Sequence, residues 1–211
     1  MSANVYYEVL EPHDAEEALK CSVSAVIAGE PTTKAVKGDQ ADFHYMMTVF
    51  AQVIVNEGLS IVAKDQQSHQ IVGCAICKDF LAFPKQGFEQ ISQALLSSFS
   101  IFEKLEGDYK KEYSIKPGEL FQLLILGVLE PFRLSNIGTQ LVLEAERQAQ
   151  KRHFKGITAT LSSPISQHIF LNKLGYKEVS SILYQDFEYQ GQKIFTSITE
   201  CESCKLSIKK F

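Results

Sequence analysis

Residues 125–146, ILGVLEPFRLSNIGTQLVLEAE, decide how this chain folds. The most apolar run of the sequence, LFQLLILGVLE at residues 120–130, overlaps the beginning of this stretch. That run is too short for a membrane-spanning helix and rich enough in aliphatic residues for a strand buried on both faces. From Gly138 to Gln150 the apolar positions follow a helical period. The stretch therefore predicts a buried strand that leads through a short loop directly into a helix.

The loop at 133–139, RLSNIGT, is the first candidate binding site. The first N–H groups of a helix have no intrahelical partner and lie at the positive end of the helix dipole, so such a loop suits an anion, above all a pyrophosphate. Gly138 would let the backbone approach phosphates closely. An ordinary strand-to-helix turn would show the same pattern, so the loop alone leaves both readings open.

This loop resembles the acetyl-CoA loop of the GNAT superfamily of N-acetyltransferases, Arg/Gln-x-x-Gly-x-Gly/Ala after the fourth strand. Arg133 and Gly138 match that pattern, while Asn136 replaces its first glycine. Asn tolerates the left-handed backbone region better than other non-glycine residues. The resemblance implies that acetyl-CoA is bound by the loop and by the end of the strand before it. The implied contacts are Leu126, Gly127, Val128, Arg133, Leu134, Ser135, Asn136, Ile137, Gly138 and Thr139.

Two further motifs extend the resemblance over nearly the whole chain. FLNKLGYKEV (170–179) is similar to the closing helix–Gly–strand motif of GNAT domains. Glu30-Pro31, with YYEVLEPHDAEEA before it and QDFEYQGQKIF near the end, resembles the insect-type arylalkylamine N-acetyltransferases. The match is patchy between residues 35 and 115. The resemblance implies an α/β (α+β) GNAT fold, with a mixed, mostly antiparallel sheet of about seven strands, helices on both faces and a splayed acetyl-CoA cleft.

The remaining patterns agree with one domain over residues 1–211. Alternating or apolar runs predict strands at 4–11, 59–65, 70–79 and 156–160, and a closing hairpin of 178–189 with 193–198. Helical periods predict a helix that ends at Gly29, with Asp14 as its cap or a first-turn charge, and further helices at 42–55, 88–109, 138–150 and 166–174. Pro31 is expected to follow the first helix without continuing it.

Composition excludes several classes of function. A formal net charge of −4 argues against a nucleic-acid surface, which needs a basic stripe. We expect no membrane segment, because no apolar run reaches the ~20 residues that a bilayer requires. The start lacks the features of a secretory signal, and five cysteines leave an odd number. These observations predict a cytoplasmic, reduced protein, and they leave its oligomeric state unknown.

The resemblance also assigns catalytic roles. It implies that Glu30 is the base that deprotonates the amine, through a water, and that a backbone N–H within 126–128 polarises the acetyl carbonyl. Many GNAT enzymes use a tyrosine on the last helix to protonate the thiolate, but Leu171 stands there. The arylalkylamine branch implies Ser162 and Ser166 instead, with Ser163 as a substitute. Ser162 and Ser163 could equally be loop or cap residues.

Two CxxC pairs raise the question of a metal site. Cys74 and Cys77 lie in a predicted strand, where residues three apart point to opposite faces. Cys201 and Cys204 are expected in a C-terminal tail. Neither pair has the glycine-rich setting of a zinc knuckle, so we predict no metal.

The sequence thus favours direct transfer of acetyl from acetyl-CoA to a small primary amine, such as an arylalkylamine, in a ternary complex without a covalent intermediate. Two alternatives stay open. One is acetylation of a peptide N-terminus or lysine, which would need an open groove. The other is a degenerate GNAT domain that serves as a binding or structural component, as Asn136 and Leu171 would allow.

Overall fold

The computed structural model describes residues 4–133 and 135–211. Its centre is a sheet of seven strands in the order β1-β2-β3-β4-β5-β7-β6, in which β4 and β5 are parallel and every other pair is antiparallel. The strands are β1 Val5–Val9, β2 Ile61–Asp65, β3 Ile71–Asp79, β4 Leu120–Val128, β5 Gly156–Leu161, β6 Lys177–Leu183 and β7 Ser203–Lys210. The predicted fold class is confirmed.

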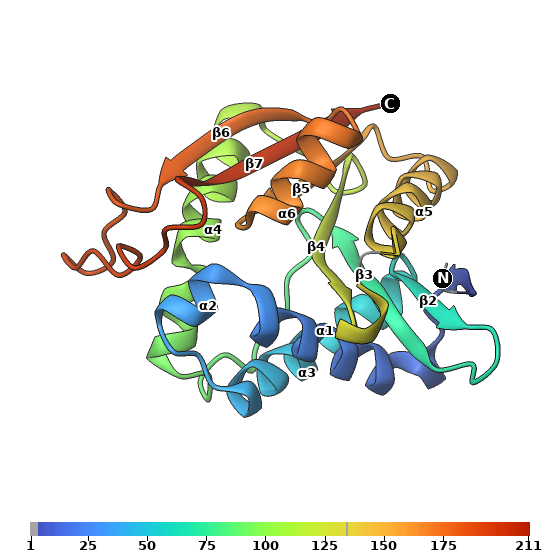
Figure 1. Cartoon of the computed structure of the whole chain (residues 1–211). Helices are drawn as coiled ribbons and strands as arrows, with labels where there is room; N and C mark the ends of the chain where they lie inside the picture. Colours follow the sequence, from blue (N-terminus) through green and yellow to red (C-terminus); the bar gives the residue numbers. More distant parts are fainter. Residues whose placement is uncertain (1–3, 134) are drawn as a thin grey trace.

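Helices cover both faces of this sheet (Figure 1). They are α1 Ala15–Gly29, α2 Pro31–Ala35, α3 Gln40–Glu57, α4 Gln93–Tyr113, α5 Ile137–Lys151 and α6 Pro164–Gln167, which continues as a π-helical turn, η3 His168–Lys173. Short 3-10 turns occupy Pro12–Asp14 and Glu130–Phe132. No helix within the described ranges is long and apolar enough to cross a membrane.

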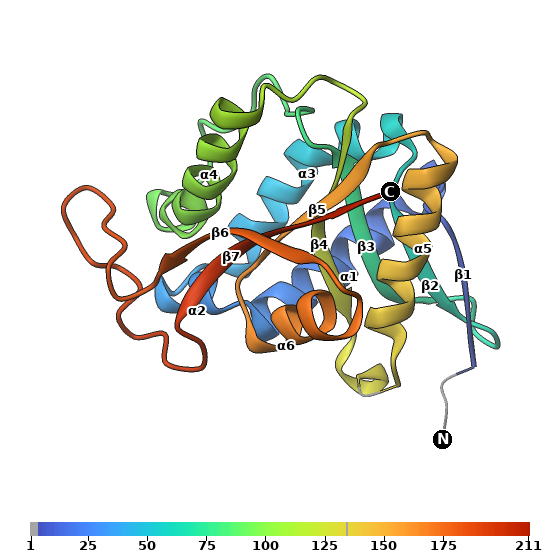
Figure 2. The same cartoon turned by 90° about the horizontal axis from the view of Figure 1, so that it is seen from above.

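The core is divided by the sheet into separate apolar clusters. On one face α5 and η3 pack against the strands through residues such as Leu141, Ala145 and Phe170. On the other face α1 and α3 pack against β2 and β3. Beside them α4 packs against β6, β7 and the segment that joins these strands, around the buried rings of Tyr184 and Phe195 (Figure 2). These contacts hold α4 against the β6–β7 end of the sheet, beyond α3.

α1 ends at Gly29 as predicted, and the sequence did not predict the short helix that follows it. Pro31 does not merely follow α1: it occupies the first position of a new short helix, α2, with Glu30 as its N-cap. Proline is favoured there because the first helical N–H has no partner to lose. Asp14 stands at the N-cap position of α1, but its side chain makes no capping bond and instead accepts from Lys64 Nζ at 2.6 Å in a buried ion pair.

The predicted closing hairpin is wrong in its second strand. Residues 193–198 form turns, and β6 pairs with β7, which contains Cys204. Phe195 and Ile198 are nevertheless buried, and their spacing of three lets both face α4 from a turn. Cys204 is fully buried and Cys201 half-buried, so neither belongs to a free tail.

Candidate functional site

The candidate site lies where the backbone pairing between β4 and β5 ends. Their parallel pairing runs from Leu120 opposite Gly156 to Leu123 opposite Ala159 and ends there, although β4 continues to Val128. Past Leu123, β4 is therefore paired only on its β3 side among the described strands. A sheet edge of this kind leaves backbone donors and acceptors available to an extended ligand.

A β-bulge lies at the same point. The β3 register passes from Ile76 opposite Ile125 to Cys77 opposite Leu123, which leaves Leu124 as the extra residue on β4. Bulges bend a strand and re-aim its groups, and they are frequent near active sites. The bend therefore coincides with the separation of β4 from β5.

The direction of the β4 amides beyond the bulge follows from one hydrogen bond. Leu129 donates to the carbonyl of Val72 on the β3 side. Because backbone groups alternate along an antiparallel pair, those of Gly127 also face β3, and those of Leu126 and Val128 face the side that β5 has left. Of the three residues predicted to contact the cofactor here, Leu126 and Val128 offer backbone groups to the open side.

Gly127 is required by packing rather than by a ligand. A Cβ at this position would lie 2.9 Å from Cβ of Ala25 and 3.5 Å from Sγ of Cys74. The glycine thus admits α1 closely to the opposite face of β4. The bulge of β4 lies three residues earlier, at Leu124.

The loop before α5 keeps its amides available. Asn136 adopts the left-handed conformation, φ 63° and ψ 8°, as the N-cap of α5, and its side chain makes no capping bond. Within the described residues, the first backbone bond of the helix runs from Gln140 to Asn136, and no backbone oxygen accepts from Ile137 or Thr139. Asn136 therefore adopts the backbone conformation that glycine favours, and its side chain does not bond to the amides at the start of α5.

The other residues of the loop have mixed surroundings. Arg133 is exposed, and its Nε donates to the carbonyl of Val128 at 3.3 Å, which links the loop to the end of β4. Ser135 is bonded through its hydroxyl to the carbonyl of Phe132. The predicted contact Leu134 lies outside the described residues. Gly138 leaves room for a Cβ at ordinary contact distances from Ile169, Val128 and Leu126, so its immediate neighbours are apolar.

Glu30 lies between α1 and α2 with one carboxylate oxygen engaged. Oε2 accepts from the backbone N–H of Thr33 at 2.5 Å and from the hydroxyl of Thr32 at 2.8 Å. Oε1 is buried and has no hydrogen-bond partner among the described residues. A buried acceptor without a partner is costly unless a water or a ligand group satisfies it. The cap thus fixes the carboxylate and leaves one oxygen to act on something else.

Two of the predicted serines have structural roles. Ser163 is the N-cap of α6, and its hydroxyl accepts from the backbone of Ser166 at 3.2 Å. Ser166 completes the capping box, since its hydroxyl contacts the backbone N–H and carbonyl of Ser163. The predicted catalytic role of Ser166 must therefore compete with a cap that already uses its hydroxyl.

Ser162 lies in a cluster that the sequence did not reveal. Its carbonyl accepts from the hydroxyl of Tyr184 at 2.7 Å and from the thiol of Cys201 at 3.3 Å. The Glu30 carboxylate is close enough to raise the pKa values of both donors, although burial is the larger cause. The carbonyl of Ser162 is thus the shared acceptor of two donors that lie within electrostatic range of Glu30. Tyr184 and Cys201 were missed because the register of β6 and β7, not a local pattern, brings them there.

The last helix lacks a proton donor where many GNAT enzymes have a tyrosine. The backbone of Leu174 donates to Ile169, five residues back, so η3 is π-helical. Such a turn accommodates one extra residue in the helix. If the position of the family's tyrosine is counted one residue earlier to allow for the π-helical turn, Phe170 stands there instead of Leu171. Neither side chain can donate a proton.

The sheet separates the two cysteines of the first CxxC pair. Cys74 and Cys77 are both fully buried, in the clusters on opposite faces of the sheet, as predicted. Among the described residues no group of three or more His, Cys, Asp or Glu side chains could hold a metal ion.

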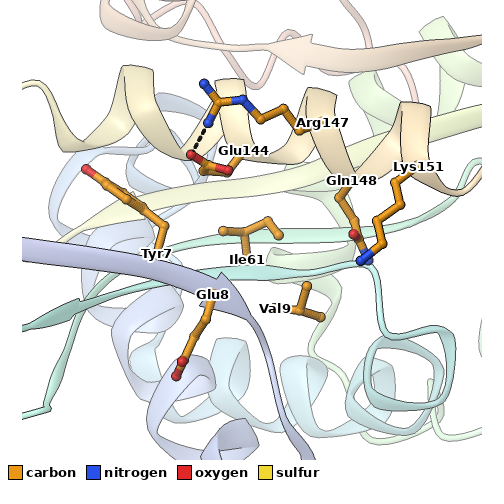
Figure 3. Close-up of a pocket in the computed structure, with 8 residues that line it drawn as sticks. All are labelled: Tyr7, Glu8, Val9, Ile61, Glu144, Arg147, Gln148 and Lys151. Atoms are coloured by element: carbon orange, nitrogen blue, oxygen red, sulfur yellow. Dashed lines mark hydrogen bonds and ion pairs between the residues drawn. The ribbon is translucent and has the colours of Figure 1, made fainter.

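Two surface hollows lie outside the opening between β4 and β5. The larger, about 230 Å³, lies between β1 and α5 (Figure 3) and is lined by Tyr7, Glu8, Val9, Ile61, Glu144, Arg147, Gln148 and Lys151. It contains none of the predicted site residues, and its Glu144 and Arg147 already pair with each other. A smaller hollow of about 130 Å³ lies beside Glu30, between α2 and residues 197–200.

The chemistry of Cys201 gives a testable prediction. Burial, with Glu200 and Glu30 nearby, raises the pKa of its thiol to about 11. Only the thiolate is alkylated. The rate of iodoacetamide modification at Cys201, followed by mass spectrometry, should therefore rise about tenfold per pH unit between pH 7.5 and 9.5. A rate that levels off by pH 9, with Cys201→Ser as the blank, would contradict this environment.

No protein-family model matches the chain, and no curated protein matches it significantly in sequence. Solved structures match it closely in shape. The C-terminal condensation domain of Ebony, in complex with β-alanyl-dopamine, superposes with a TM-score of 0.88 at 20% identity over 98% of this chain and 99% of that chain. Arylalkylamine N-acetyltransferase 2 from Aedes aegypti gives 0.78 at 19% identity over 98% and 99%.

A third structure, the Drosophila melanogaster polyamine N-acetyltransferase that forms N-acetylagmatine, gives a TM-score of 0.71 at 17% identity over 98% of this chain and 100% of that chain. At such identities the likeness establishes the fold. The parted strands β4 and β5, the bulge, and the loop that opens α5 thus belong to a chain with the GNAT fold, in the form found in insect arylalkylamine N-acetyltransferases and in the condensation domain of Ebony.

Proposed function

We propose that this chain is an acyltransferase that moves acetyl from acetyl-CoA to a small primary amine, by direct attack within a ternary complex. The observation that carries the proposal is the adjacency of two sets of available amides. The β4 edge loses its β5 partner after Leu123, and among the described residues the N–H groups of Ile137 and Thr139, at the start of α5, donate to no backbone oxygen. A ligand with an extended amide-bearing arm and a pyrophosphate matches both sets.

The residues present suit that donor. The loop at 133–139 would hold the phosphates on backbone N–H groups, with Arg133 beside them, and the open edge at Leu126 and Val128 would pair with the pantetheine arm. The cluster of Ile169, Val128 and Leu126 around Gly138 offers apolar contact to the arm. These assignments rest on backbone geometry, so the replacement of glycine by Asn136 does not remove them.

Glu30 supports the handling of the amine. An alkylammonium has a pKa near 10, so it must lose a proton before it attacks a thioester. Oε1 of Glu30 is buried and without a partner, while Oε2 is held by α2. We assign the base to Glu30 on this ground, with the proton passing directly or through one water.

The remaining steps need a donor to the acyl oxygen and a proton for the departing thiolate. The amide of Leu126 faces the open side just after the bulge and can stabilise the oxygen as negative charge develops on it. Ser162 is the better placed of the two predicted serines, because Ser166 is committed to the cap. With both reactants bound side by side, most of the rate comes from proximity.

A second candidate changes the acyl group. The Ebony condensation domain was solved with β-alanyl-dopamine, an amide that joins the carboxyl of a β-amino acid to the amine of dopamine. This chain follows that domain over 98% of its own length with a TM-score of 0.88, against 0.78 for the Aedes enzyme. Transfer of a β-aminoacyl group to an aryl amine is therefore the alternative, and it would use the same base and the same oxygen-binding amide.

The donor and acceptor are identified together by one experiment. Acetyl-CoA and β-alanyl-CoA are each incubated with dopamine, tyramine, tryptamine, agmatine, putrescine and a peptide with a free N-terminus, and released thiol is measured. We expect turnover of acetyl-CoA with at least one small amine. Turnover with β-alanyl-CoA alone supports the second candidate, turnover with the peptide alone supports a protein acetyltransferase, and no turnover with any pair rejects the proposed activity.

The variant Glu30→Gln tests the base. Glutamine can still accept from Thr33 and cap α2, so the fold should be retained, but it cannot take a proton. We expect kcat/KM to fall by about 10²-fold or more and the acid limb of its pH profile to flatten.

The matched control is Glu200→Gln, because Glu200 is a nearby exposed carboxylate at the rim of the hollow beside α2. It should keep the wild-type profile. An unaltered acid limb in Glu30→Gln would remove Glu30 from the mechanism.

A further inference from the structure

A polar cluster lies on the α4 face of the sheet, where β4 and β5 part. Oε1 of Glu106, on α4, accepts from Nε2 of Gln122 on β4 at 2.7 Å and from the hydroxyl of Thr160 on β5 at 3.1 Å. Gln122 is 1% exposed. One carboxylate oxygen therefore joins the two strands through their side chains.

The side-chain link lies at the end of the backbone pairing between β4 and β5. Gln122 lies within the paired part of β4, opposite Thr158, whereas Thr160 lies one residue beyond the last pair, Leu123 with Ala159. The link thus crosses the end of the ladder. Past this point no backbone hydrogen bond between β4 and β5 occurs within the described pairing, so side chains must set how far the strands separate.

Glu106 is itself held in place. Leu105 and Ile101 of the same helix are buried in the cluster with β7 and the 184–202 segment. Its Oε2 lies 3.7 Å from Nζ of Lys110. Burial lowers the pKa of the neighbouring Lys78 to about 8, with Glu106 acting in the opposite direction. An anchored, charge-assisted acceptor makes stronger hydrogen bonds than a neutral one.

We propose that Glu106 is a positioning residue for acyl transfer, which fixes the separation of β4 and β5 and thereby the aim of the β4 amides after the bulge. The inference rests on the proposed function. Leu124 and Leu126 lie further along the same strand as Gln122, so a shift of that strand moves the amide that faces the acyl oxygen. Such amides act only when they are held at hydrogen-bond distance from the place where charge develops.

The kinetic test compares Glu106→Ala, Glu106→Gln, Thr160→Val and the double variant Glu106→Ala/Thr160→Val. Removing the link should lower kcat by about 10-fold or more, with a smaller change in KM for the acyl donor, because misplacement of reacting groups is felt in the transition state. Glu106→Gln retains an oxygen that can accept both bonds and should restore most of kcat.

The double variant should lose little more than Glu106→Ala, since both residues act through one link. Glu103→Ala, an exposed carboxylate one turn earlier on α4, is the control and should resemble the wild type. Additive losses, an unchanged kcat in Thr160→Val, or an equal loss in Glu103→Ala would overturn the proposal.

A measurement without substrate separates this inference from the proposed function. Amide hydrogen exchange at residues 124–128 and 160–161 should be faster by several-fold in Thr160→Val than in the wild type and in Glu103→Ala. Equal exchange in all three proteins would overturn the link. If the wild type transfers no acyl group from any donor, the proposed function fails, while the exchange experiment still decides whether Glu106 holds the strands.

Discussion

The separation of β4 from β5 after Leu123 and Ala159 is the constraint on which the rest of the structure depends. A parallel pair that stops halfway leaves backbone groups without partners, and such groups are costly unless something binds them. Around the gap the chain supplies a bulge at Leu124, a side-chain link through Glu106, and a loop that opens α5. Each of them keeps the separation open in a defined geometry.

Two carboxylates approach the same region from different helices. Glu30 and Glu106 both raise the pKa of the buried Cys204 thiol, after the larger effect of burial, so both lie near that residue on β7. Their surroundings differ. Glu106 Oε1 accepts two hydrogen bonds from the strands, whereas Glu30 keeps one buried oxygen without a described partner. Glu106 thus links two strands, whereas Glu30 keeps an oxygen that a water or a ligand group can satisfy.

Most of the fold could be predicted from the sequence because its signals are local. The apolar run of β4, the helical periods and the glycine after η3 each determine one element. What failed depended on distant contacts: the β7 strand was taken for a tail, because only pairing with β6 makes it a strand. For the site, Glu30 and the 133–139 loop followed from motifs. Tyr184 and Cys201 did not, since their shared acceptor, the carbonyl of Ser162, lies in a different part of the chain.

The central claim is that the loop before α5 and the open edge of β4 bind one ligand together. The most direct test is a titration of the ¹⁵N-labelled protein with CoA, followed through its amide resonances. The account predicts saturable shifts at Leu126, Val128, Ile137, Gly138 and Thr139. Saturation with shifts confined to the hollow between β1 and α5, or no shift at millimolar CoA, would contradict it.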